Sequence, residues 1–155
     1  MNRGFLLRFL AFGVLSLAAA SLGGLFTARG LGAWYDGLAK PSWTPPGPVI
    51  GAVWTVLFAL LAIASALVWK DGRPAGYTVV LLANLVLNVL WSYLFFARRN
   101  PAAALKELFA LEASCLALIV LAAPVSRAAA ALLVPYAAWV AFAGFLNWTV
   151  VRMNR

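Results

Sequence analysis

The stretch from Trp34 to Trp54, WYDGLAKPSWTPPGPVIGAVW, organises the chain because it joins the first long apolar segment to the second. It contains three of the seven Trp and four of the eight Pro residues. The fixed φ angles of Pro45, Pro46 and Pro48 make this backbone stiff and non-helical, and Pro48 suits the first turn of a following helix. We therefore expect an ordered loop that leads directly into a helix.

The same stretch carries aromatic rings of the kind found at the level of lipid headgroups, namely Trp34, Tyr35 and Trp43. Two interpretations fit them. The loop is either an interfacial anchor that binds no ligand, or a lid above a ligand site. The residues of this stretch alone leave both interpretations open.

The composition predicts an integral membrane protein. Of the 155 residues, 65% are hydrophobic and only 10% are charged, whereas a water-soluble domain has about 25% charged residues. The net charge of +8 does not indicate nucleic-acid binding, because the basic residues flank the apolar segments and form no patch. The length fits one compact domain over residues 1–155.

The apolar segments predict an all-α integral membrane protein, a bundle of five transmembrane helices with an ordered loop between the first two. The approximate spans are residues 5–28, 49–69, 75–97, 102–122 and 128–151. Each has about 20 residues, enough to cross about 30 Å of hydrocarbon. Basic residues are in slight excess on the side of the loop, which places the loop and the C-terminus in the cytoplasm.

Polar side chains inside these segments need partners. Asn84, Asn88 and Ser92 fall on one helical face and should point inward, either to other helices or to a polar ligand. Glu112 lies near the middle of its segment and should face the bundle interior or a neighbouring chain rather than lipid.

Small residues mark one face of the first segment. Ser16, Ala20 and Gly24 are spaced by four, as are Ala19 and Gly23. This spacing lets helices approach closely, and the partner is either a helix of the same bundle or a second chain.

Several kinds of chemistry have no residues to support them. The sequence has no His, the commonest metal and haem ligand and the usual general base. Its single Cys, Cys115, lies in an apolar segment and is most simply a small buried hydrophobe. No cluster has metal-ligand spacing, and there is no glycine-rich phosphate loop. We expect no metal site and no required cofactor.

Three motifs resemble the translocator protein family, also called the tryptophan-rich sensory proteins or peripheral benzodiazepine receptors. They are WYDGLAKPSWTPPG with Trp54 after it, LNVLWSYLFF from Leu87 to Phe96, and VPYAAWVAFAGFLNW from Val134 to Trp148. The resemblance covers nearly the whole chain in order. It implies a membrane receptor for tetrapyrroles, with protoporphyrin IX or haem as ligand, and for benzodiazepine-site ligands. It also implies a homodimer.

The family pocket can be carried over residue by residue. It falls on Tyr35, Pro45, Ile50, Trp54, Phe58, Asn88, Trp91, Ser92, Trp139 and Ala143, and by a looser alignment on Leu108 and Leu111. The low acidic content and the lack of a eukaryotic targeting pattern favour a bacterial cytoplasmic membrane.

Three function classes remain open. The first is a receptor or sensor of tetrapyrroles, and the second is an enzyme that promotes light- and oxygen-dependent porphyrin breakdown through Trp54 and Trp139. The third is a transporter of porphyrin or sterol. The lack of an internal repeat argues against conventional alternating access. The lack of His argues against a haem enzyme but not against Trp photochemistry.

Overall fold

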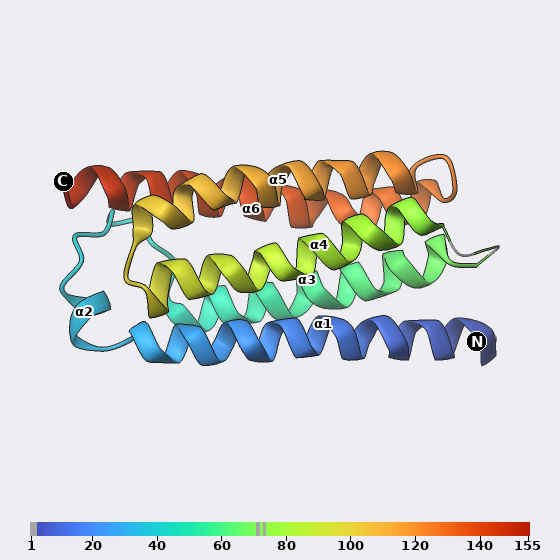
Figure 1. The fold of residues 1–155 in the computed structure, drawn as a ribbon, viewed down its shortest axis with the longest axis horizontal. Coiled ribbons are helices and arrows are strands. Elements are labelled where there is room, and N and C mark those ends of the chain that lie inside the picture. Colours follow the sequence, from blue (N-terminus) through green and yellow to red (C-terminus); the bar gives the residue numbers. More distant parts are fainter. Residues whose placement is uncertain (1–2, 71, 73) are drawn as a thin grey trace.

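The structure, a computed structural model, describes residues 3–70, 72 and 74–155, and this part of the chain is helical without any strand (Figure 1). The elements are α1 Arg3–Gly30, α2 Ala33–Asp36, α3 Gly47–Val68, α4 Ala75–Ser92, the π-helix η1 Tyr93–Ala97, α5 Pro101–Ala122 and α6 Arg127–Met153. The long helices lie roughly along one axis, with the N-terminus at one end and both α2 and the C-terminus at the other.

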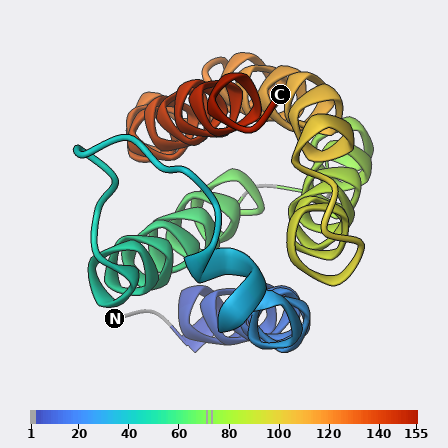
Figure 2. The ribbon, with the colours of Figure 1, turned by 90° about the vertical axis from the view of Figure 1, so that its left-hand side faces the viewer.

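The long helices form a ring. Helix α1 packs against α3 and α4, α3 and α5 both pack against α6, and α4 packs against α5. Figure 2 looks onto the end that carries α2, where the segment between α1 and α3 runs across the ring. We call residues 31–46 the lid segment.

Within the described residues, four helices are long and apolar enough to cross a membrane: α1, α3, α4 together with η1, and α6. This finding agrees with the predicted all-helical class and with the predicted spans at residues 5–28, 49–69, 75–97 and 128–151. Helix α5 has 22 residues, as α3 does, but contains Lys106, Glu107 and Glu112. Its role as a fifth span therefore stays a prediction.

The helix starts follow from local chemistry. Pro48 lies in the first turn of α3, as the sequence predicts. The Asn100 side chain accepts a hydrogen bond from the backbone N–H of Ala103 at 3.0 Å, at the start of α5. The Ser126 side chain accepts one from Ala129 at 3.2 Å, at the start of α6. Such caps satisfy N–H groups that have no partner within the helix.

The predicted helix over residues 75–97 ends in a π-helix, which the sequence did not indicate. The backbone N–H of Arg98 donates to the carbonyl of Tyr93 at 2.8 Å, a π-helical spacing of five residues. Both Phe95 and Phe96 are buried beside α2, with Tyr35 against Phe96 at 5.6 Å between ring centroids. The wider turn thus supplies the aromatic support beneath the lid segment.

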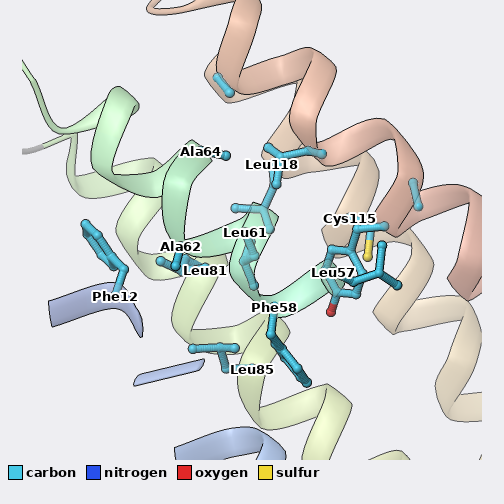
Figure 3. Packing of buried hydrophobic residues seen from close by; sticks show 14 of the residues in the cluster. Phe12, Leu57, Phe58, Leu61, Ala62, Ala64, Leu81, Leu85, Cys115 and Leu118 are labelled. Carbon is cyan, nitrogen blue, oxygen red and sulfur yellow. The ribbon is translucent and has the colours of Figure 1, made fainter. Parts of the chain in front are cut away.

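The long helices share a tightly packed hydrophobic core. Figure 3 shows side chains of α3 in contact with those of α1, α4 and α5. Leu61 and Ala62 of α3, Leu81 of α4 and Leu118 of α5 are all at most 2% exposed. The hydroxyls of Ser65 and Tyr77 lie 3.0 Å apart within this core, so its few polar atoms have partners.

Candidate ligand-binding site

A cavity of about 840 Å³ lies between the long helices and extends from the lid segment as far as Phe9 of α1 and Ala62 of α3. Residues of all the long helices line it, together with residues of the lid segment and η1. Its volume is within the range of about 300–1,000 Å³ that is typical of small-molecule sites. Most of the lining is apolar or aromatic, and a few polar groups interrupt it.

All of the predicted pocket residues except Pro45 line this cavity. They are Tyr35, Ile50, Trp54, Phe58, Asn88, Trp91, Ser92, Leu108, Leu111, Trp139 and Ala143. Pro45 is half-buried in the lid segment but is not part of the lining; Thr44 and Gly47 line the cavity there instead. The structure thus brings the predicted residues together, while their binding of a ligand stays a prediction.

The small side chains of α1 leave space for the cavity. Ser16, Ala20, Gly23 and Gly24 all line it. A methyl group added at Gly23 would lie 3.2 Å from the Ser92 hydroxyl, so α1 and α4 approach closely at this point. The predicted contact with a helix of the same bundle is therefore present, and these residues also leave space for a ligand.

The two candidate Trp residues lie on different helices and both line the cavity. The Trp54 ring packs against Phe58 at 5.7 Å and meets Tyr136 edge-on at 6.1 Å. Trp139 packs against Phe142 at 5.1 Å. The Trp139 indole nitrogen is buried and has no hydrogen-bond partner within the described part of the chain. A buried indole N–H without a partner is unusual in a folded protein.

A buried polar network lies beside the cavity and links three helices. The Asn84 amide donates to Ser114 at 2.8 Å, and the Tyr136 hydroxyl donates to Asn84 at 2.9 Å. The Asn88 amide donates to the Tyr136 hydroxyl at 3.3 Å and also lines the cavity. Of the two interpretations of this polar face, interhelical hydrogen bonding holds for Asn84 and Asn88. Cys115 is buried and accepts from Asn84, as a small core residue.

Asn147 is a lining residue that the sequence analysis missed. The Trp91 indole donates to the Asn147 side chain at 3.2 Å, and Asn147 donates to the carbonyl of Pro101 at 2.8 Å. Asn147 thus fixes the Trp91 ring on the cavity wall and ties α6 to the start of α5. An amide inside an apolar segment, next to Trp148, was the signal that could have indicated it.

Tyr35 and Lys40 line the lid end of the cavity. The Lys40 ammonium lies 4.5 Å from the centroid of the Tyr35 ring and donates to the backbone carbonyls of Tyr35 and Leu38. Burial, and then the negative charge of Asp36, raise the pKa of the Tyr35 hydroxyl above its usual value of 10.0. Tyr35 therefore keeps its proton at neutral pH and remains a hydrogen-bond donor.

The lid segment is attached to α6 at two points. The Asn154 side chain accepts from the backbone N–H of Ala39 at 3.0 Å and donates to the Ala39 carbonyl at 2.9 Å. The Trp43 ring stacks on Phe145 at 5.4 Å with an interplanar angle of 14°. The first contact joins residues 115 positions apart, so it holds the lid segment to the end of the chain.

Asn154→Ala should loosen the lid segment and speed ligand exchange. The substitution removes both hydrogen bonds to Ala39, each worth about 0.5–1.5 kcal/mol, while the Trp43 contact remains. We expect the association and dissociation rates of a cavity ligand to rise together, with a smaller change in affinity. Stopped-flow fluorescence with protoporphyrin IX measures both rates. Thr149→Ala, on the exposed side of α6, is the matched control. Equal rates in Asn154→Ala and the parent would contradict the assignment.

The acidic residues of α5 lie in different places. Glu112 is half-buried in a groove between α5 and α6, and one of its carboxylate oxygens is buried without a partner in the described part of the chain. It therefore lies in a groove outside the cavity, and the predicted cover by a neighbouring chain stays a prediction. Glu107, which the sequence analysis did not single out, is only 9% exposed, and neither of its oxygens has a partner among the described residues. Neither residue lines the large cavity.

Comparison with known proteins decides the family. The model of the TspO/MBR family matches residues 11–153. The chain belongs to the TspO/MBR family. It is 37% identical to the tryptophan-rich protein TspO of Chlorobaculum tepidum over 158 aligned positions, which cover 99% of each chain. It is 42% identical to the human translocator protein over 126 positions, 78% of this chain and 75% of the human protein.

Membership in the TspO/MBR family confirms the resemblance seen in the three motifs. Together with the four apolar helices, it identifies an integral membrane protein of this family. Another relative is protein CrtK of Rhodobacter capsulatus, at 35% identity over 92% of each chain. Names such as translocator protein point to a receptor or transport role in a membrane, and they belong to those relatives.

Proposed function

We propose that this TspO/MBR protein is a membrane receptor or sensor that binds tetrapyrroles, chiefly protoporphyrin IX, in the cavity beneath the lid segment. The observation that carries the proposal is the cavity wall. Trp54, Phe58 and Trp139 offer aromatic surface, and the buried Trp139 indole N–H has no partner among the described residues. A flat apolar ligand with polar edges would cover the rings and supply an acceptor for that N–H.

The proposal includes a membrane arrangement. Helix α5 would be the fifth span, and the lid segment would be an ordered cover at one membrane surface. The antiparallel contacts of α5 with α4 and α6 support this arrangement, because both of those neighbours are span candidates. We also propose a homodimer in a bacterial cytoplasmic membrane, and crosslinking in native membranes tests the oligomeric state.

The decisive experiment is a fluorescence-quench titration of the purified protein with protoporphyrin IX, carried out in darkness. We expect saturable quenching of Trp fluorescence with one ligand for each chain, because Trp54, Trp91 and Trp139 line the cavity. Haem and an isoquinoline carboxamide should compete for the same site. Quenching that rises linearly with porphyrin, as in detergent without protein, would contradict the proposal.

A second candidate function is porphyrin breakdown driven by light and oxygen. The position of Trp54 and Trp139 on the cavity wall favours it, since an indole in contact with an excited porphyrin is a donor of one electron. Illumination of the complex in air should then convert bound porphyrin to new products, whereas a pure receptor would return it unchanged.

A transporter of porphyrin or sterol is the alternative from another class. It requires a route to both membrane surfaces, whereas Leu61, Leu81 and Leu118 are almost completely buried in the core of the bundle. Flux of porphyrin across sealed vesicles distinguishes a transporter from a receptor or enzyme.

A further inference from the structure

Lys40 places a positive charge at the lid end of the cavity, and no negatively charged residue lines the described wall. Among the described residues that line the cavity, Lys40 is the only charged one. The remaining polar groups of the lining are neutral hydroxyl, amide and indole groups. A ligand that fills this cavity therefore meets a full positive charge at one end and neutral, mostly aromatic surface elsewhere.

Lys40 is held in place by neutral groups. Its ammonium donates to the carbonyls of Tyr35 and Leu38, the second at 3.0 Å, and lies over the Tyr35 ring. A third contact, to the carbonyl of Asp36, is 3.5 Å long and therefore weak. An ammonium has three N–H donors, so one of them is available for a better acceptor.

These contacts orient the charge without neutralising it. Carbonyl dipoles and an aromatic face attract a cation but carry no net negative charge. A carboxylate that replaced the long Asp36 contact would form a charge-assisted hydrogen bond, roughly twice as strong as a neutral one. We propose that Lys40 is a specificity-determining residue that selects flat ligands carrying a carboxylate, and that it receives this group at the lid end of the cavity.

The inference rests on the proposed function only in taking the cavity as the site of a flat ligand. It also predicts how the ligand is oriented in the cavity. The carboxylate edge lies beside Lys40 and Tyr35, at the polar end of the bundle, while the apolar body lies against Trp54 and Trp139. This arrangement keeps the ligand charge out of the membrane interior, where an ionised group is costly.

The test is a comparison of acid and ester ligands on Lys40 variants. The probes are protoporphyrin IX and its dimethyl ester, which share one macrocycle and differ in charge. A second pair, 1-pyrenebutyric acid and its methyl ester, has a different flat body. Dark affinities are measured for the parent, Lys40→Met and Lys40→Arg. The ratio between variants cancels differences in detergent partitioning between the probes.

We expect Lys40→Met to weaken binding of each acid about tenfold or more and of each ester by less than about twofold, since a hydrogen bond to a charged group is lost only for the acid. Lys40→Arg should restore most of the preference for the acid. Asn154→Ala, which loosens the lid segment without removing the charge, should change acid and ester affinities by the same factor.

Two results would overturn the inference. One is equal weakening of acid and ester by Lys40→Met, which would make Lys40 a support of the lid segment only. The other is an acid preference in Lys40→Met equal to that of the parent. If neither porphyrin binds while the pyrene acid shows the Lys40-dependent preference, the tetrapyrrole proposal fails and the carboxylate site stands. If neither pair shows that preference, the carboxylate site fails.

Discussion

Trp54→Phe and Trp139→Phe should each stop light-driven porphyrin loss while leaving most of the dark affinity. A phenyl ring still covers the ligand, so only part of the stacking energy is lost, and that energy is about 0.5–1.5 kcal/mol beyond area burial. The affinity should therefore fall by less than about tenfold. The photochemical rate should fall to that of free porphyrin in detergent, because phenylalanine is a much poorer electron donor than indole.

Dark titration and photobleaching on the same samples measure the two effects side by side. Trp148→Phe is the matched control, because Trp148 is 41% exposed and stacks on Phe145 outside the cavity lining. Unchanged affinity and unchanged bleaching in both cavity variants would remove Trp54 and Trp139 from the site. Loss of thermal stability alone, with normal binding for each folded molecule, would make them packing residues.

Gly30→Ala should destabilise the protein strongly. A methyl group at Gly30 would lie 2.6 Å from the Phe96 carbonyl oxygen and 2.7 Å from its Cα, so the end of α1 and the π-helix must separate. Overpacking of this kind costs about 1–3 kcal/mol. For a chain of this size that corresponds to a fall in melting temperature of roughly 2–4 °C for each kcal/mol. Thermal unfolding in detergent measures it.

Gly13→Ala is the control for the helix itself. It lies on the same helix, and an added methyl group there meets nothing within 4 Å. Alanine favours a helix over glycine by about 0.5–1 kcal/mol, so this variant should be as stable as the parent or slightly more so. If Gly30→Ala melts at the same temperature as Gly13→Ala, η1 moves away from α1 at little cost in stability. In that case the close contact would not support the lid segment.

The helices could be predicted from the sequence because apolar length, proline positions and side-chain caps are local signals. The cavity residues could be predicted because the family motifs fix Trp54, Trp91 and Trp139 by their spacing, and only Pro45 fell outside the lining. The π-helix could not be predicted, since its extra residue is stabilised by packing of Phe96 against Gly30, far away in the chain.

The contacts of the lid segment could not be predicted from the sequence either. Asn154 reads as an ordinary polar residue after the last helix, and its two bonds to Ala39 exist only once the lid segment and the end of α6 come together. Lys40 reads as one of many basic residues that flank apolar segments. Its place in the cavity wall depends on the path that the lid segment takes after α2.

The presence of a packed core and a large cavity in one bundle links the lifetime of the protein to what it contains. Leu61 and Leu118 are almost completely buried, whereas about 840 Å³ lies open between the same helices. A ligand there takes the place of missing core side chains, and it stabilises the folded state by RT ln(1 + [L]/Kd). At a hundred times Kd this is about 2.7 kcal/mol. Under the proposed function, empty chains should unfold and be degraded sooner than filled ones, so the amount of protein in the membrane would itself record the supply of ligand.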